Sequence, residues 1–260
     1  MADEAYGNPR LAALYDPLDS DRGDLDVYAA VADELRARQV LDVGCGTGTF
    51  ALLLADRGLA VTGVEPAAAS LGVARAKPGS DRVRWIHGDA TALPEMRVDL
   101  ATMTANVAQA IVDPEAWEST LRGIHAALRP GGHLVFETRD PARRAWEEWT
   151  WAATHRTVTV DGVGPVETWV DVTDVSLPLV SFRHTFLITA TGETLTSDST
   201  LRFRERSEVE ASLTAHGYVV DEIRDAPDRP GKEFVFLARR PHSREPLSAD
   251  SSDTSAASDR

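Results

Sequence analysis

The sequence has little of what disulfide-bonded, membrane-spanning or secreted proteins require. It contains one cysteine, Cys45, so an intrachain disulfide and a cluster of thiolate metal ligands are both excluded. No apolar run approaches the roughly 20 residues of a membrane helix. The first ten residues, MADEAYGNPR, lack the cationic and then apolar pattern of a secretory signal. We therefore expect a soluble cytoplasmic protein with no membrane partner.

Positive charge is also scarce. Lysine and arginine number 27 against 41 aspartate and glutamate residues, which gives a formal net charge of −14. An acidic surface repels phosphate backbones, so we predict no nucleic-acid partner. With 260 residues, 43% of them hydrophobic, the chain can bury the core of one large domain, with or without an inserted subdomain.

Strand and helix patterns alternate between residues 25 and 137. This alternation predicts right-handed crossovers and a mostly parallel sheet with helices on both faces. Asp24 and Asp113 are expected to cap two of the helices, and RPGG at 129–132 is expected to be a turn. The predicted strands are QVLDV, LAVTGVE, RVRWIHGD, RVDLATMT and HLVFETR, and the predicted helices are DLDVYAAVADELRA, TFALLLADRG, AAASLGVARA and DPEAWESTLRGIHAAL.

A two-residue period replaces this alternation from about 154 to 204. Asp161-Gly162 is a hairpin turn signal, and a second turn is expected near Gly192, so an antiparallel meander is inserted at about 145–204. Ser207 and Glu210 then form a predicted capping box, and two further strands bring the main sheet to seven. We expect the domain to span 1–240. The polar segment 241–260 is expected to be disordered.

The stretch VLDVGCGTG runs from a strand into three glycines at alternate positions, Gly44, Gly46 and Gly48. A glycine turn before a helix exposes N–H groups that a ligand can approach closely. A dinucleotide site requires the pattern G-x-G-x-x-G, which fails here because Thr49 follows Gly48. The same glycines can also form a purely structural turn.

Residues 40–140 resemble class I S-adenosylmethionine (SAM) dependent methyltransferases, in particular small-molecule enzymes of actinobacterial type. The resemblance rests on five stretches in order: VLDVGCGTG, VTGVEPAAASLGVARAKP, VRWIHGDATALP, VDLATMTANVAQAI and LRPGGHLVFETRDP. It implies a Rossmann-like fold, SAM as cofactor and S-adenosylhomocysteine (SAH) as product. It also implies methyl transfer to a small molecule.

The resemblance also implies which residues contact the cofactor. Glu65, at the end of the second strand, would accept hydrogen bonds from the ribose hydroxyls, and its charge would repel the 2′-phosphate of NADP. Asp89 and the Ala90 N–H would bind adenine, and carbonyls from 104 to 106 would bind the methionine ammonium. The predicted cofactor-binding residues are Asp42, Gly44, Cys45, Gly46, Thr47, Gly48, Glu65, Pro66, Asp89, Ala90, Thr104, Ala105 and Asn106.

Several of these residues have a second interpretation. Glu65 or Asp89, taken alone, is an ordinary solvated acid. Asp42 can contact SAM or hydrogen-bond the glycine-loop backbone instead, and Cys45 can be a small residue in a tight turn. No set of histidine and acidic residues has metal-ligand spacing, so we predict no metal.

The acceptor site is less defined, and no catalytic residue can be assigned. Candidates that would come near the acceptor are His184, Asn106, Arg139 and Tyr15, with Gln109 beside them. His184 shares its strand face with apolar residues, a pattern more typical of a hydrogen-bonded core residue than of an acceptor contact. Trp146 and Trp149 can line the acceptor, although anchoring the insertion is the commoner role for such a pair. Tyr6 and Tyr15 can form a lid or pack as a helix.

The predicted function is transfer of a methyl group from SAM to a small-molecule acceptor through an N- or O-nucleophile, an amine-bearing metabolite being one candidate. The alternative is a non-catalytic SAM- or SAH-binding regulatory or scaffold protein, and a dinucleotide oxidoreductase is a more distant rival. The protein is expected to be a monomer or a homodimer.

Overall fold

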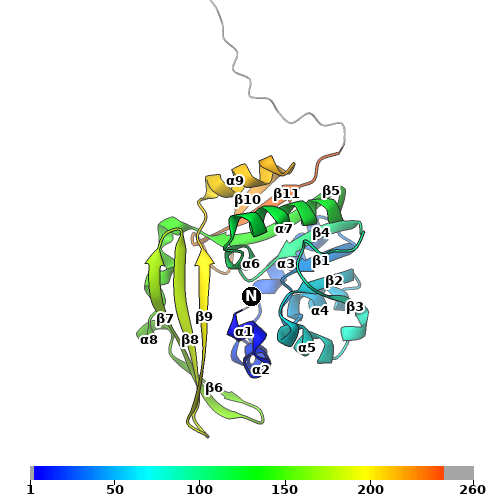
Figure 1. The fold of residues 1–260 in the computed structure, drawn as a ribbon. Coiled ribbons are helices and arrows are strands. Elements are labelled where there is room, and N and C mark those ends of the chain that lie inside the picture. The colour runs from blue at the N-terminus through cyan, green and yellow to red at the C-terminus, as the bar shows by residue number, and fades with distance from the viewer. Residues whose placement is uncertain (1–2, 243–260) are drawn as a thin grey trace, which may run out of the picture.

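The computed structural model describes residues 3–242, and its largest element is a seven-stranded sheet (Figure 1). The strand order is β10-β11-β5-β4-β1-β2-β3, and β11 alone runs antiparallel to its neighbours. The strands are β1 (Gln39–Val43), β2 (Ala60–Glu65), β3 (Val83–His87), β4 (Val98–Met103), β5 (Leu128–Arg139), β10 (Val219–Asp225) and β11 (Glu233–Arg239). The predicted mostly parallel, Rossmann-like sheet is confirmed.

Helices cover both faces of this sheet because successive strand residues alternate between two apolar cores. Val40 packs with helices α3 and α4 on one face, whereas Leu41 packs with α7 and α9 on the other. The helices are α3 (Asp24–Glu34), α4 (Thr49–Asp56), α5 (Ala68–Ala76), α6 (Val107–Ala110), α7 (Pro114–Ala127) and α9 (Arg206–Ala215), with a short turn η1 (Ser80–Arg82).

Three details of the helix and turn predictions need correction. Asp113 caps α7 as expected, but α3 is capped by Gly23, and Asp24 is its first residue. The capping box is wrong: α9 begins at Arg206, and no side-chain hydrogen bond caps its described N-terminus. Residues 129–132 belong to β5, as a bulge where the pairing with β4 jumps from Leu128 to His133.

The predicted insertion is a four-stranded antiparallel sheet between β5 and α9, with turns at Asp161-Gly162 and Gly192 as expected. Trp146 packs edge-on against Phe203 at a ring-centroid distance of 4.7 Å, and Val180 completes this anchor cluster. The elements of the insertion are η2 (Pro141–Arg143), η3 (Ala145–Glu148), α8 (Trp151–Thr154), β6 (Arg156–Val160), β7 (Gly164–Ser176), β8 (Leu179–Ile188) and β9 (Glu193–Arg202).

The N-terminal helices α1 (Glu4–Gly7) and α2 (Pro9–Leu18) lie between the two sheets, as Figure 1 shows in dark blue. The apolar face of α2 packs on the inner face of the insertion. This shared cluster contains Leu11, Leu14, Leu18, Val160, Val166, Phe186 and Ile188. The N-terminal segment therefore joins the insertion to the main sheet.

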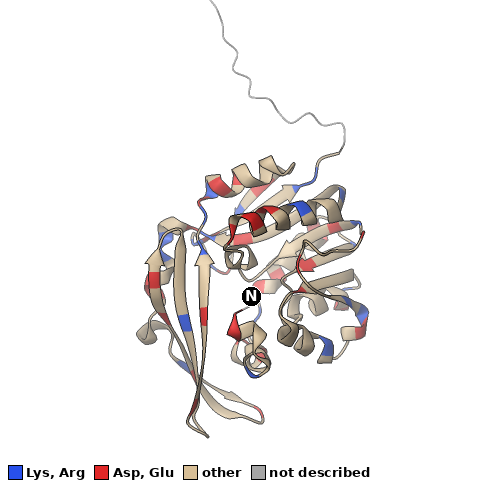
Figure 2. Cartoon of the chain, in the orientation of Figure 1, with Lys and Arg blue, Asp and Glu red and all other residues tan. Residues whose placement is uncertain are grey.

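Within residues 3–242, no helix is both long and apolar enough to cross a membrane. Charged residues are spread along the helices and strands, with basic residues among acidic ones (Figure 2). Most of the polar segment predicted to be disordered, from residue 243 onward, lies outside the described residues.

Candidate cofactor site

The glycine loop connects β1 to α4 at the carboxyl edge of the sheet. Gly44, Gly46 and Gly48 have φ values of +69°, +54° and +79°, a region that side chains other than glycine rarely occupy. A Cβ on Gly44 would lie 2.7 Å from a methyl group of Val107, and one on Gly48 would lie 2.6 Å from the Trp85 ring. Both the backbone conformation and the packing therefore require glycine in this loop.

A cavity of about 500 Å³ opens beside the loop, which is within the usual size range for a small-molecule site. Its walls come from the carboxyl ends of β1, β2 and β4, from the segment after β3, and from helices α1, α2, α6 and α7. Ten of the thirteen predicted cofactor-binding residues line it: Gly44, Cys45, Gly46, Thr47, Glu65, Pro66, Asp89, Ala90, Thr104 and Ala105.

Glu65 is buried at the end of β2 and lines the cavity. One oxygen accepts a hydrogen bond from the Gly46 N–H at 2.9 Å, and the other accepts from the Ala67 N–H at 2.8 Å. Burial raises the pKa of Glu65, and these two backbone bonds oppose the rise. Each oxygen keeps a second lone pair, so both can still accept from a ligand hydroxyl.

Asp89 and Ala90 follow β3 and form the adjoining wall. Asp89 Oδ1 accepts from the backbone N–H and the hydroxyl of Thr91 at 2.8 and 2.5 Å, which fixes the carboxylate against the turn. Ala90 is buried, and its carbonyl would lie 1.9 Å from a Cβ on Gly123 of α7. The α7 helix is thus packed close behind this part of the cavity.

Three predicted residues do not line the cavity: Asp42, Gly48 and Asn106. Asp42 lies inside the sheet, accepts from the Thr102 hydroxyl at 3.0 Å, and has a pKa raised to about 7 by burial. Cys45 is buried in the tight loop, and burial raises the pKa of its thiol.

Sequence reasoning missed several lining residues. Arg22 reaches the cavity from the loop before α3 and forms an ion pair with Asp24 at 3.1 Å. No pattern in the nearby sequence identifies Arg22 as a lining residue, because the path of the N-terminal segment determines where its side chain lies. Ala116 and Thr120 of α7 line the cavity, and their spacing of four on one helix was the available signal. The other missed lining residues are Asp3, Val43, Thr49, Phe50, Val107, Ala110 and Ile111.

Tyr6 and Tyr15 cover the cavity from α1 and α2, with ring centroids 5.9 Å apart. Asp16 fastens this segment to the glycine loop by accepting from the Thr47 hydroxyl at 2.7 Å and pairing with Lys77 at 2.6 Å. Burial raises the pKa of the Tyr15 phenol, so it stays protonated at neutral pH. Both tyrosines therefore lie where a lid would lie.

The same segment is fastened to the insertion. The Ala5 N–H donates to Ser197 Oγ at 2.8 Å, and Arg10 forms a two-pronged ion pair with Glu193. Together with the apolar cluster under α2, these bonds hold the N-terminal segment against β8 and β9.

His184 lies on the inner face of the insertion rather than at the cavity. Its Nε2 is 2.5 Å from the Thr168 hydroxyl, and its ring centroid is 4.1 Å from that of Phe186. Burial lowers the pKa of His184 to about 4, so the ring is neutral at pH 7. These are the contacts expected of a hydrogen-bonded core histidine.

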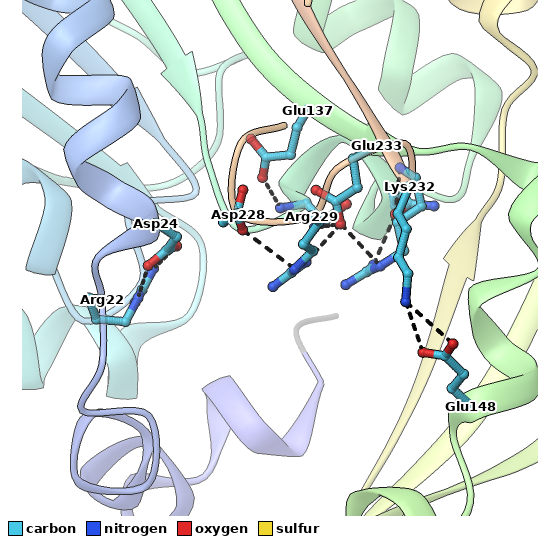
Figure 3. A network of polar contacts seen from close by, with 11 residues as sticks. Arg22, Asp24, Glu137, Glu148, Asp228, Arg229, Lys232 and Glu233 are labelled. Carbon is cyan, nitrogen blue, oxygen red and sulfur yellow. Dashed lines mark hydrogen bonds and ion pairs between the residues drawn. The ribbon is translucent and has the colours of Figure 1, made fainter. Parts of the chain in front are cut away.

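Arg139, Asn106 and Gln109 belong to a polar network behind the cavity. The Arg139 guanidinium lies 5.5 Å from the Trp149 ring, donates to Gln109 Oε1 at 3.0 Å, and pairs with Glu233 at 3.5 Å. Figure 3 shows this network around Glu137, Arg229 and Glu233. Trp149 also contacts Phe182 and Phe203, so it anchors the insertion as Trp146 does.

Residues 40–132 match the protein family described as "Methyltransferase domain". The cypemycin N-terminal methyltransferase of a Streptomyces species is 35% identical over 109 residues, which cover 42% of this chain and 44% of that protein. A ubiquinone biosynthesis O-methyltransferase of Alkalilimnicola ehrlichii is 34% identical over 122 residues, covering 44% and 47%. The chain thus spans about half the length of the curated relatives it matches.

Solved structures share the whole fold. The CcbJ methyltransferase of Streptomyces caelestis aligns with a TM-score of 0.72 at 23% identity, over 93% of this chain and all of that one. An amino pentose methyltransferase from Micromonospora echinaspora, involved in calicheamicin biosynthesis, aligns with a TM-score of 0.66 at 24% identity, over 88% and 95%.

Proposed function

We propose that this chain, a class I SAM-dependent methyltransferase by its fold and by the domain at residues 40–132, transfers a methyl group from SAM to a small-molecule acceptor. One observation carries the proposal. The glycine loop, Glu65 and Asp89 line a single cavity at the carboxyl ends of neighbouring parallel strands, where open α/β sheets bind their ligands.

The lining residues fit the chemical groups of SAM. Glu65 offers acceptors to a ribose diol, and the wall formed by Asp89 and Ala90 offers an acceptor and an N–H to adenine. Carbonyls of Thr104 and Ala105 suit an ammonium group. Among the described lining residues, Arg22 carries a guanidinium group, and we propose that this group binds the methionine carboxylate.

When bound, SAM supplies an electrophilic methyl group attached to a sulfonium. The chain's own contribution is chiefly alignment, which can account for about 7–11 kcal/mol of a barrier. The lid residues Tyr6 and Tyr15 would exclude water from the cavity, and the bonds of Asp16 to the glycine loop would hold that lid in place.

The acceptor is proposed to be a small amine. The N-terminal helices α1 and α2 lie between the cavity and the insertion, and we propose residues 145–204 as the acceptor-side subdomain. Tyr15 is held protonated, and Glu65 already accepts two backbone hydrogen bonds, so neither is a free base. An amine needs no base to attack, whereas a hydroxyl benefits from one. The amino pentose enzyme among the structural relatives supports this preference.

Calorimetric titration with SAM, SAH, NAD and NADP tests the cofactor. We expect SAM and SAH to bind, and tight NAD binding without SAH binding would reject the proposal. Labelled SAM with a panel of small amines and matched alcohols then tests transfer. Labelled amine products would support the proposal, whereas SAH binding with no transfer to any acceptor would favour a regulatory or scaffold protein.

A further inference from the structure

We propose that Glu137 is a positioning residue for the cofactor. Its buried carboxylate holds residues 104–106, between β4 and α6, in the turn with left-handed Ala105 and Asn106 that forms one wall of the cavity. The inference rests on the proposed function, because it takes SAM or SAH as the ligand of that cavity.

The turn is strained. Ala105 and Asn106 have φ values of +57° and +60°, and neither is glycine. Asparagine tolerates this conformation better than alanine does, but two consecutive non-glycine residues in it persist only where their surroundings enforce it. The sequence contains 18 glycines, yet none stands at this turn. Something outside the turn must therefore hold it.

Glu137 on β5 is the direct contact. Its Oε1 accepts the hydrogen bond of the Asn106 N–H, and the side chain is buried. Two weaker contacts from the same network also support the turn. Asn106 Nδ2 donates to Glu233 at 3.4 Å, and Arg139 donates to Gln109, three residues further along the segment.

The turn and the first residue of α6 line the cavity with Thr104, Ala105 and Val107. Val107 also packs against the glycine loop, because its methyl groups occupy the space that a Cβ on Gly44 would need. A turn released from Glu137 would therefore change two walls of the cofactor cavity together, although Glu137 itself does not line it.

A purely structural role does not account for this carboxyl. Burial raises the pKa of Glu137 to about 7, partly opposed by hydrogen bonds to Tyr28 and Asn106. Holding an ionisable group there is unfavourable, and an apolar residue of similar size would fill the same space without that cost. The hydrogen bond to Asn106 supplies a reason for an acceptor at this position.

The test compares Glu137→Gln, Glu137→Leu, Asn106→Gly and the double variant Glu137→Leu/Asn106→Gly by SAH titration and by melting temperature. Gln keeps a carbonyl acceptor, so its SAH affinity should stay within about threefold of wild type. Leu removes the acceptor and should weaken SAH binding about tenfold or more. Glycine adopts the φ of residue 106 without strain while Ala105 keeps its own, so Glu137→Leu should cost less SAH affinity in the Asn106→Gly background than in wild type.

Unchanged SAH affinity in Glu137→Leu would overturn the proposal, as would an equally large loss in the Asn106→Gly background, measured on a folded double variant. If Glu137→Leu does not fold, amide exchange of wild-type protein without ligand decides. A protected Asn106 amide, about 100-fold slower than a free amide, is expected, and free exchange overturns the proposal. This measurement needs no cofactor, so absent SAH binding by wild type would reject the proposed function alone.

Discussion

Replacing Glu65 with alanine is the sharpest test of the cofactor site, because the structure separates two consequences of the change. The carboxylate accepts from Gly46 and Ala67, and it also faces the cavity. Alanine therefore removes two backbone hydrogen bonds in the free protein and the ribose contacts in the bound one. The first effect lowers stability, and the second lowers affinity.

The magnitudes follow from the type of bond. Hydrogen bonds to a charged group contribute about 1.5–3 kcal/mol each, so losing two ribose contacts costs about 3–6 kcal/mol. A factor of ten corresponds to about 1.4 kcal/mol, and we expect SAH affinity to fall about 10²-fold or more. Each of the two unpaired N–H groups should lower the free energy of unfolding by roughly 1–3 kcal/mol, so about 2–6 kcal/mol together.

Asp99 provides a matched control at the opposite edge of the sheet. One of its oxygens accepts from two backbone N–H groups, those of Arg38 and Gln39, at 2.7 and 2.9 Å. Asp99→Ala should therefore lower stability while leaving SAH affinity unchanged. Titration calorimetry at a temperature where both variants are folded measures the affinities. A folded Glu65→Ala protein that binds SAH within threefold of wild type would refute the ribose assignment.

Three other predictions concern the wider site. Asp42 has a folded pKa of about 7 against an ordinary 3.8, so the folded state holds an extra proton between these values and loses stability as pH rises through them. Asparagine does not titrate, so the free energy of unfolding of Asp42→Asn, measured relative to wild type by denaturant titration, should rise by up to about 4 kcal/mol between pH 4 and pH 8. A difference that does not change with pH would contradict this. His184→Ala should lower the melting temperature, with a loss of roughly 1–3 kcal/mol in the free energy of unfolding, and should leave SAH affinity within about threefold of wild type. An unchanged melting temperature would argue against a core role, and activity per folded molecule tests an acceptor role. Arg22→Gln should weaken SAH at least about tenfold but leave 5′-methylthioadenosine, which lacks the carboxylate, nearly unaffected; equal losses would exclude the assignment.

The sequence was most informative where a local pattern has one physical explanation. Alternating apolar residues and the glycine triplet predict the sheet and the loop, because strand ends and positive φ values are local properties. The ten predicted lining residues belong to the loop itself or were implied by the resemblance of five stretches to class I methyltransferases. The position of Arg22 depends on the path of the loop between α2 and α3, and no residue near it in the sequence predicts that path. The contact between Glu137 and Asn106 joins residues 31 positions apart and is equally invisible in the sequence. Ser207 and Glu210 had capping-box spacing, but α9 begins one residue before Ser207.

The two-sided fastening of the lid has a kinetic consequence. Residues 3–18 bond to the glycine loop through Asp16 and to the insertion through Ala5 and Arg10. A cofactor can enter or leave past Tyr6 and Tyr15 only when some of these bonds open. Under the proposed function, replacing SAH with SAM would require the contacts with the insertion to loosen as well, and this exchange, rather than the chemical step, would be a candidate for the step that sets the turnover rate.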